Sequence, residues 1–530
     1  MKPIRLVAGF LTVGLWTMLS RVLGFVRDIL IAGTLGAGPV ADAFFVAFAL
    51  PNMFRRFFAE GAFNMAFVPM FSKRVEAGED AEGFARDALS GLATVLVVFT
   101  LVALAAMPWL VLAMASGFRG DVRFDLAVDF GRIVFVYILF ISLAALLSGV
   151  LNATGRFAAA AAAPVLLNII LIVLLFTAES GVLAETIVIG TAAAAGIEGL
   201  HHGTMLAIGV VLAGLAQLWL LWRAAATAGF DLRPRWPSMT PELKRLAIVA
   251  APAALAGGVI QINLLVGRQV ASFFEGAIAW LNFADRLYQL PLGVVGIAIG
   301  VVLLPDLSRR LGAGDDAGGK NAFNRAAEIC LALTIPAAVA LCVIATPLVS
   351  VLFERGRFTA EDTAATALAV AVYGLGLPAF VLQKVYQPLF FAREDTRTPL
   401  RYAFWAMLVN AVVAIGLAPL IGYIAAAIGT TMAGWAMVWL LARGAKGLGD
   451  AAQFDDRFAR RIWRIVLAAL GMGVVIWGLS VAMEDALTTA GLRYAALTLV
   501  VAAGIGSYFA LGQVLGAFRI SEFRAALKRR

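Results

Sequence analysis

The chain has 530 residues, of which 62% are hydrophobic and only 14% are charged, and its formal net charge is +9. A soluble domain has roughly 45–50% apolar and 25% charged residues, so this composition excludes a soluble protein and indicates a polytopic membrane protein. The positive charge does not indicate nucleic-acid binding, because most Lys and Arg residues lie in short segments between apolar runs.

Apolar runs of about 20 residues, the length that crosses ~30 Å of hydrocarbon, recur along the whole chain. They predict an all-α polytopic membrane protein with about 14 transmembrane helices. The expected spans are residues 6–33, 39–71, 88–115, 126–151, 161–178, 203–224, 246–272, 279–307, 325–352, 363–391, 400–419, 421–442, 462–482 and 492–516.

Lys and Arg residues gather in alternate connections between these spans. By the positive-inside rule these connections are cytoplasmic, and the same sidedness predicts that both termini are cytoplasmic. On the opposite side, Arg119, Arg123, Arg355 and Arg357 are expected in outer loops, where they weaken the bias.

An internal repeat divides the chain. FVPMFSKR around Pro69 recurs as LLPDLSRR around Pro305, and Tyr137 recurs as Tyr373, both at an offset of about 236 residues. Each copy holds six spans, so the pattern predicts two six-helix lobes in parallel repeat, followed by two further helices. The expected divisions are a lobe at 1–225, a cytoplasmic linker at 226–245, a second lobe at 246–445, and the last two helices with a basic tail at 446–530.

The first two spans contain charged residues where a membrane helix should have almost none. These residues are Arg21, Arg27, Asp28, Asp42, Arg55, Arg56 and Glu60. An ionised side chain at the bilayer centre costs about 2.5–3.5 kcal/mol on a translocon scale, so these groups must face water, carboxylates or an anionic ligand.

Structural ion pairing is the alternative to ligand binding. Arg56 and Glu60 are four residues apart and fit a helical ion pair, and Asp285 with Arg286 could form another. Lys384 fits either a functional lysine or one that extends to the membrane surface. However, arginines outnumber carboxylates in this set, and a surplus of Arg suits an anionic substrate such as a diphosphate.

Cofactor signals are weak in this sequence. His201 and His202 are the only histidines, and without further ligands at a suitable spacing they make a poor metal site. There is no GxxxxGK[ST] motif, which argues against an ATP-driven pump. We therefore expect no metal site and assign no cofactor, with coupling to membrane potential, Na⁺ or H⁺ left open.

Several motifs resemble the MurJ (MviN) lipid II flippase family of the MOP exporter superfamily. They are SRVLGFVRD at 20–28, ADAFFVAFALPNMFRRFFAEGAFNMAFVP at 41–69, LNATGRFAAAAAAPVLLN at 151–168, WLNFADRLYQLPLGVVGIAIGVVLLPDLSRR at 280–310 and LFERGRFTAEDT at 352–363. The resemblance implies fourteen helices, two lobes around a central cationic cavity, and a lateral groove for a lipid tail at the last two helices.

The resemblance also implies a function and a set of site residues. The family carries lipid II, the undecaprenyl-diphosphate-linked peptidoglycan precursor, from the inner to the outer leaflet of the bacterial cytoplasmic membrane, a step in cell-wall biogenesis. Alternating access is the expected mechanism. The expected substrate contacts are Arg21, Arg27, Arg55, Arg286 and Asp42. The expected gating or ion-pair residues are Asp28, Arg56, Glu60, Asp285 and Lys384.

Other functions are compatible with this sequence. A related exporter could flip another polyprenyl-linked saccharide or exchange drugs and cations, although a cation exporter should have surplus acid. A scaffold for cell-wall synthesis and a membrane glycosyltransferase are alternatives from other classes. Expected partners are lipid II, membrane lipids and the cell-wall synthesis machinery, and no nucleic acid.

Overall fold

The computed structural model describes residues 6–55, 62–180, 196–233, 235–298 and 303–517. Every regular element in these ranges is a helix, which confirms the all-α prediction. The chain packs as two units. The first contains Met1–Ala279 together with Arg355–Phe358, and the second contains Trp280–Glu354 and Thr359–Arg530.

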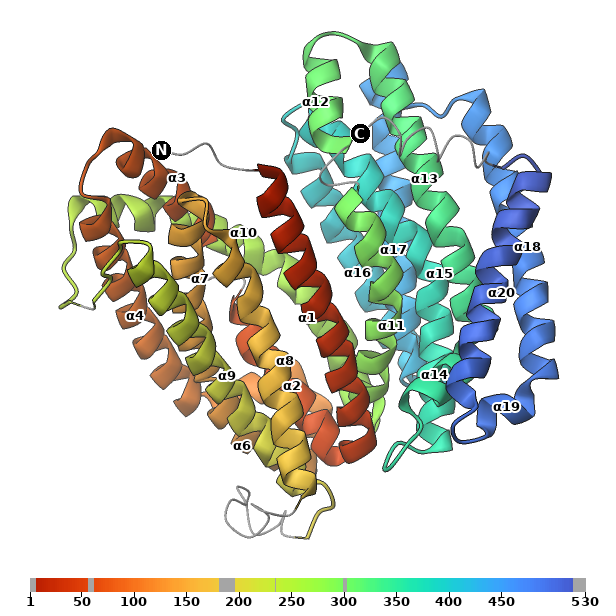
Figure 1. Cartoon of the computed structure of the whole chain (residues 1–530), viewed down its shortest axis with the longest axis horizontal. Coiled ribbons are helices and arrows are strands. Elements are labelled where there is room, and N and C mark those ends of the chain that lie inside the picture. Colours follow the sequence, from red (N-terminus) through yellow and green to blue (C-terminus); the bar gives the residue numbers. More distant parts are fainter. Residues whose placement is uncertain (1–5, 56–61, 181–195, 234, 299–302, 518–530) are drawn as a thin grey trace. The chain divides into compact units, whose positions relative to one another are not determined.

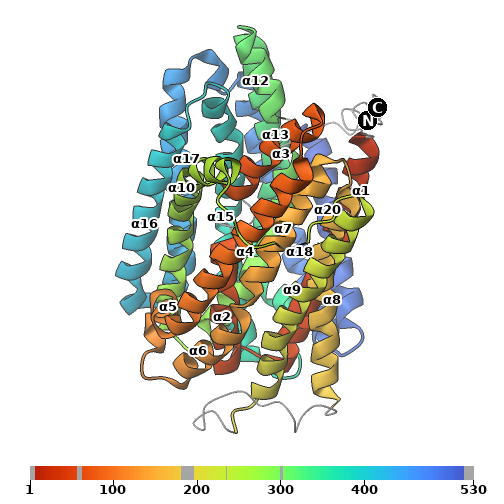
Figure 2. The ribbon, with the colours of Figure 1, turned by 90° about the vertical axis from the view of Figure 1, so that its left-hand side faces the viewer.

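The first unit contains ten α-helices within its described residues, and α8 lies alongside α9 (Figures 1 and 2). The helices are α1 (Leu6–Leu35), α2 (Pro39–Arg55), α3 (Ala62–Ala77), α4 (Ala81–Ala105), α5 (Met107–Met114), α6 (Val122–Val134), α7 (Tyr137–Ala153), α8 (Phe157–Glu179), α9 (Leu200–Thr227) and α10 (Pro241–Ser272), with a 3₁₀ turn, η2, at Ser116–Phe118.

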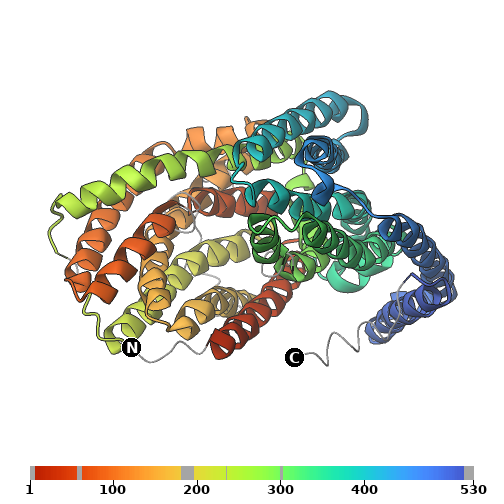
Figure 3. The same ribbon diagram turned by 90° about the horizontal axis from the view of Figure 1, so that it is seen from above.

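The second unit contains nearly all of α11 and the helices that follow it. They are α11 (Ala277–Ala298), α12 (Leu304–Gly312), α13 (Asp316–Val343), α14 (Ala345–Phe353), α15 (Ala360–Phe391), α16 (Arg397–Ile421), α17 (Ile424–Ala445), α18 (Asp456–Ala482), α19 (Glu484–Thr488) and α20 (Arg493–Val514), with 3₁₀ turns η5 (Lys446–Leu448) and η6 (Asp450–Ala452). The last two long helices, α18 and α20, pack side by side, as Figure 3 shows from above.

Ten helical segments in the described part of the chain are long and apolar enough to cross a membrane. They coincide with ten of the predicted spans. At the other four predicted spans the structure also has helices, namely α1, α2 with α3, α10, and α11 with α12. The polytopic membrane character is therefore confirmed, while the count of about 14 spans stays a prediction.

The predicted repeat is visible in the order and packing of the helices inside each unit. In the first unit α4 contacts α7, α7 contacts α9, and α8 packs against α9. In the second unit α13 contacts α15, α15 contacts α17, and α16 packs against α17. The segment formed by α6 and α7 has 32 residues, as does α15, and the repeated tyrosines Tyr137 and Tyr373 lie in these two segments.

Helix ends follow ordinary capping chemistry. Gly36, with φ of 66°, follows the last residue of α1, and Gly422, with φ of 71°, follows α16. Only glycine adopts this left-handed backbone without strain. Thr359 and Asp362 form a capping box at the start of α15. These local signals fix where the helices end.

Helix α10 packs with the first unit. Residues 246–272 are predicted to begin a second lobe, and in the structure α10 contacts α3, α4 and α5. The linker before it is also attached to this unit, because Arg235 forms a salt bridge with the buried Asp87 of α4 and its N–H donates to Ser90 Oγ at 3.1 Å. The predicted lobe boundaries themselves stay predictions.

Candidate functional site

Arg27 and Asp28 form a buried ion pair in α1. The Nε and Nη2 atoms of Arg27 donate to Asp28 Oδ1 at 3.0 and 2.7 Å. Its Nη1 donates to Asn168 Oδ1 of α8 at 2.9 Å, and Asn168 Nδ2 in turn donates to the carbonyl of Ser20 at 2.9 Å. Arg27 is only 6% exposed. In this structure Arg27 therefore joins α1 to α8, and its guanidinium is turned into the protein.

Arg21 is placed differently from Arg27, although both lie on α1. Its side chain is exposed. It lies 15 residues after the start of α1 and 14 before its end, or about 21–23 Å from either end of the helix. An exposed arginine at the middle of an apolar helix cannot face lipid cheaply, so this position requires water or an anionic group.

The predicted charged residues at the end of α2 are only partly described. Arg55 is the last residue of α2 and is half-buried. The helix continues through Pro51, so this proline alone does not break it. Arg56 and Glu60 lie outside the described residues, and their predicted ion pair therefore stays a prediction.

Asp42 caps the N-terminus of another helix. It is completely buried in the first turn of α2. Its Oδ2 accepts the N–H of Gly276 at 2.8 Å, and its Oδ1 accepts the N–H of Ala279 at 3.0 Å, where α11 begins. A carboxylate at a helix N-terminus satisfies N–H groups that have no partner within the helix and interacts favourably with the helix dipole. We call this arrangement the Asp42 clamp.

Arg123 completes the Asp42 clamp and was missed as a functional residue. It was expected in an outer loop, but it lies in the first turn of α6 and is 5% exposed. Its Nη1 is 3.5 Å from Asp42 Oδ2 and donates to the carbonyl of Phe274 at 3.3 Å, while its Nε donates to Asp121 at 2.6 Å. Its position after Asp121, the residue that caps α6, was the available sequence signal.

A short loop segment also packs into the first unit. Arg355–Phe358, between α14 and α15, clusters with this unit, and the N–H of Arg357 donates to the carbonyl of Gly33 at 2.9 Å. A Cβ on Gly36 would lie 2.5 Å from the Arg357 carbonyl oxygen. Glycines at the end of α1 are therefore needed for this close backbone approach, which the sequence motif LFERGRF alone did not reveal.

The predicted site residues of the second unit lie on two helices. Asp285 and Arg286 are half-buried on α11, and Asp285 accepts a hydrogen bond from Gln289 of the same helix. Lys384 is exposed on α15. Gln289 was not singled out from the sequence, although its spacing from Asp285 indicates the same helix face.

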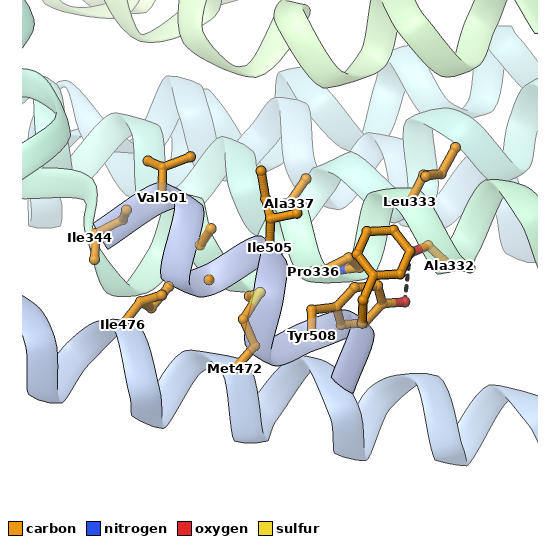
Figure 4. Close-up of a pocket in the computed structure, with 13 residues that line it drawn as sticks. Ala332, Leu333, Pro336, Ala337, Ile344, Met472, Ile476, Val501, Ile505 and Tyr508 are labelled. Carbon is orange, nitrogen blue, oxygen red and sulfur yellow. Dashed lines mark hydrogen bonds between the residues drawn. The ribbon is translucent and has the colours of Figure 1, made fainter. Parts of the chain in front are cut away.

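An apolar cavity of about 240 Å³ lies among α13, α18 and α20 (Figure 4). Met472 and Ile476 of α18 and Ile505 and Tyr508 of α20 contribute to its lining, and the Tyr508 hydroxyl donates to the carbonyl of Ala332 in α13 at 2.6 Å. The predicted lipid-tail groove at the last two helices stays a prediction, and this cavity is lined almost entirely by apolar side chains of α13 and those two helices.

In the described part of the chain, no group of three or more His, Cys, Asp or Glu residues is arranged to hold a metal ion. His202 Nε2 instead lies 3.3 Å from Glu179 Oε2 at the ends of α9 and α8.

Comparison with known proteins identifies the family. The family model described as "Lipid II flippase MurJ" matches residues 31–495. The chain belongs to the MurJ family. A protein from Rhizobium meliloti (strain 1021) named "Probable lipid II flippase MurJ" is 44% identical over 99% of this chain and 96% of its own length.

Solved structures agree with this assignment. The structure titled "Lipid II flippase MurJ, inward closed conformation" has a TM-score of 0.75 and 25% identity, and it covers 95% of this chain and 98% of its own. An inward-facing multidrug resistance MATE transporter of the MOP superfamily has a TM-score of 0.63 at 16% identity, covering 82% and 95% of the two chains, and shows the shared fold.

Proposed function

We propose that this protein flips lipid II from the inner to the outer leaflet of the bacterial cytoplasmic membrane by alternating access. Membership of the MurJ family supports the substrate, since the matching family is described by that activity. The observation that carries the chemistry is the placement of arginines well inside α1 and α11, two helices that coincide with predicted membrane spans. Arg21 is exposed in the middle of α1, and Arg286 is half-buried nine residues into α11.

Two arginines at these depths would cost about 5–7 kcal/mol if they faced hydrocarbon. An anionic head group removes this cost, and the planar guanidinium can donate two parallel hydrogen bonds to phosphate oxygens. Arg21 and Arg286 are therefore the proposed diphosphate contacts, with Arg55 as an additional contact. The prenyl chain never needs to leave the hydrocarbon, and the cavity among α13, α18 and α20 offers it an apolar surface.

The buried charges take structural roles in this proposal. Arg27 and Asp28 neutralise each other and fix α1 against α8, so Arg27 reaches a substrate only in a state in which this pair opens. The Asp42 clamp holds the first turn of α11 against α2. Its release and re-formation would be a conformational step in alternating access. Asp285 and Lys384 are the proposed gating or ion-pair residues of the second unit. Membrane potential, Na⁺ or H⁺ is the proposed driving force.

The test is transport by purified protein in proteoliposomes. Fluorescent lipid II in the donor leaflet should move across in the presence of wild-type protein, and Arg286→Ala should reduce the rate at least tenfold because it removes the diphosphate contact. Arg119→Ala is the matched control, since Arg119 is an exposed arginine beside a 3₁₀ turn and should behave as wild type. Equal rates for wild type and Arg286→Ala would refute the proposed role.

A further inference from the structure

Helix α11 carries four polar side chains on one face. Asn282, Asp285, Arg286 and Gln289 are spaced at i, i+3, i+4 and i+7, which places them within about 100° of arc on an ideal helix. Gln289 is exposed, and the other three side chains are half-buried. The charged pair is accounted for by the proposed function, but the two amides on either side of it are not.

Packing of the opposite face fixes the rotation of the helix. Phe283 and Ala284 are fully buried and Leu287 is 3% exposed. The ring of Phe283 packs on Phe353 of α14 at a centroid distance of 5.3 Å. Because this apolar side is held in the core of the second unit, the polar face must point away from that core.

The amides need polar surroundings. Helix α11 coincides with the predicted span 279–307, and an exposed glutamine within such a span is costly against hydrocarbon, so this face meets water or a polar ligand. Asn282 Nδ2 is buried and has no hydrogen-bond partner among the described residues. A buried donor without a partner costs free energy, and a ligand that accepts its hydrogen bond removes this cost.

The two amides are suited to the sugar part of the head group, whereas arginine is suited to the diphosphate. An amide both donates and accepts, as do sugar hydroxyls and N-acyl groups, whereas a phosphate oxygen only accepts. Asn282 and Gln289 are seven residues apart, about 10 Å along the helix, and Arg286 lies between them. Arg286 therefore has an amide on either side of it along the helix axis. The sugar attached to a diphosphate that is bound at Arg286 meets one of these two amides.

We propose that Asn282 and Gln289 form a saccharide-recognition subsite beside Arg286. This inference rests on the proposed function and specifies it, because it assigns selection of a glycosylated diphosphate lipid over the bare diphosphate lipid to the amide face of α11. Asp285, which accepts a hydrogen bond from Gln289, orients that amide.

The experiment compares two ligands on the full-length protein in detergent. Equilibrium binding is measured for lipid II and for undecaprenyl diphosphate, which lacks the disaccharide and peptide. The double variant Asn282→Leu/Gln289→Leu removes both amides with little change in volume. Its affinity for lipid II should fall about tenfold, while its affinity for undecaprenyl diphosphate should stay within about twofold of wild type. Leu290→Ala, at an exposed apolar neighbour, is the matched control and should keep the wild-type preference.

The affinities of the double variant for the two ligands either support the subsite or exclude it. An equal loss for both ligands, or no loss for either, would overturn the subsite. If the double variant does not fold, the single exposed-site variant Gln289→Met answers the same question with an expected loss of about threefold for lipid II alone. Arg286→Ala should weaken both ligands, so an Arg286→Ala variant that binds both normally would refute the proposed function independently of the amides.

Discussion

Replacing Asp42 with Asn should release the first turn of α11. Both carboxylate oxygens are used, one by the N–H of Gly276 at 2.8 Å and the other by the N–H of Ala279 at 3.0 Å. Asn has a single oxygen acceptor, so one of these N–H groups faces an NH₂ group and loses its partner. A hydrogen bond to a charged group contributes about 1.5–3 kcal/mol, and loss of about 2 kcal/mol should raise the open population of this turn about 30-fold.

Hydrogen–deuterium exchange measures this opening directly. A peptide that covers residues 274–280 should exchange about 30-fold faster in Asp42→Asn than in wild type, because local opening controls the exchange of protected amides. Asp125→Asn is the matched control, since Asp125 is an exposed carboxylate in the first turn of α6. Wild-type protection of this peptide in Asp42→Asn would refute the clamp.

Three further substitutions test other contacts by thermal unfolding in detergent. Asn168→Leu should lower the free energy of unfolding by about 2 kcal/mol, because the buried guanidinium of Arg27 loses a hydrogen-bond acceptor. An unchanged unfolding midpoint would contradict this role of Asn168. Gly356→Ala should destabilise the folded protein more than Gly314→Ala. Both glycines have positive φ, but only at Gly356 would a Cβ lie 2.2 Å from a main-chain oxygen of α1. Equal effects on the unfolding midpoint would disprove that contact. Tyr508→Phe should lower the free energy of unfolding by about 1 kcal/mol, because it removes the 2.6 Å hydrogen bond from the Tyr508 hydroxyl to α13. Wild-type stability of this variant would contradict that hydrogen bond.

Local sequence signals were sufficient to predict where the helices lie and which charged residues they contain. Apolar runs of membrane length placed the helices, because this signal is contained within each span. The cost of a charge in hydrocarbon identified Arg21 as an arginine at unusual depth, and the family resemblance indicated Arg286.

Partners from distant parts of the chain could not be predicted in this way. Arg27 binds Asn168, which is 141 residues away, and Asp42 binds the N–H of Gly276, which is 234 residues away. Such pairs depend on which helices pack together, and side-chain spacing within a helix carries no information about this. For the same reason Arg123 was read as a loop arginine, although tertiary packing buries it against Asp42.

The most direct test of the central claim is the amount of lipid II accessible at the outer face of cells depleted of this protein. Complementation with wild type or with Arg119→Ala should restore outer-leaflet lipid II, whereas Arg21→Ala should not, despite equal amounts of protein in the membrane. Lipid II at the outer face of depleted cells without complementation, or full restoration by Arg21→Ala, would contradict the account.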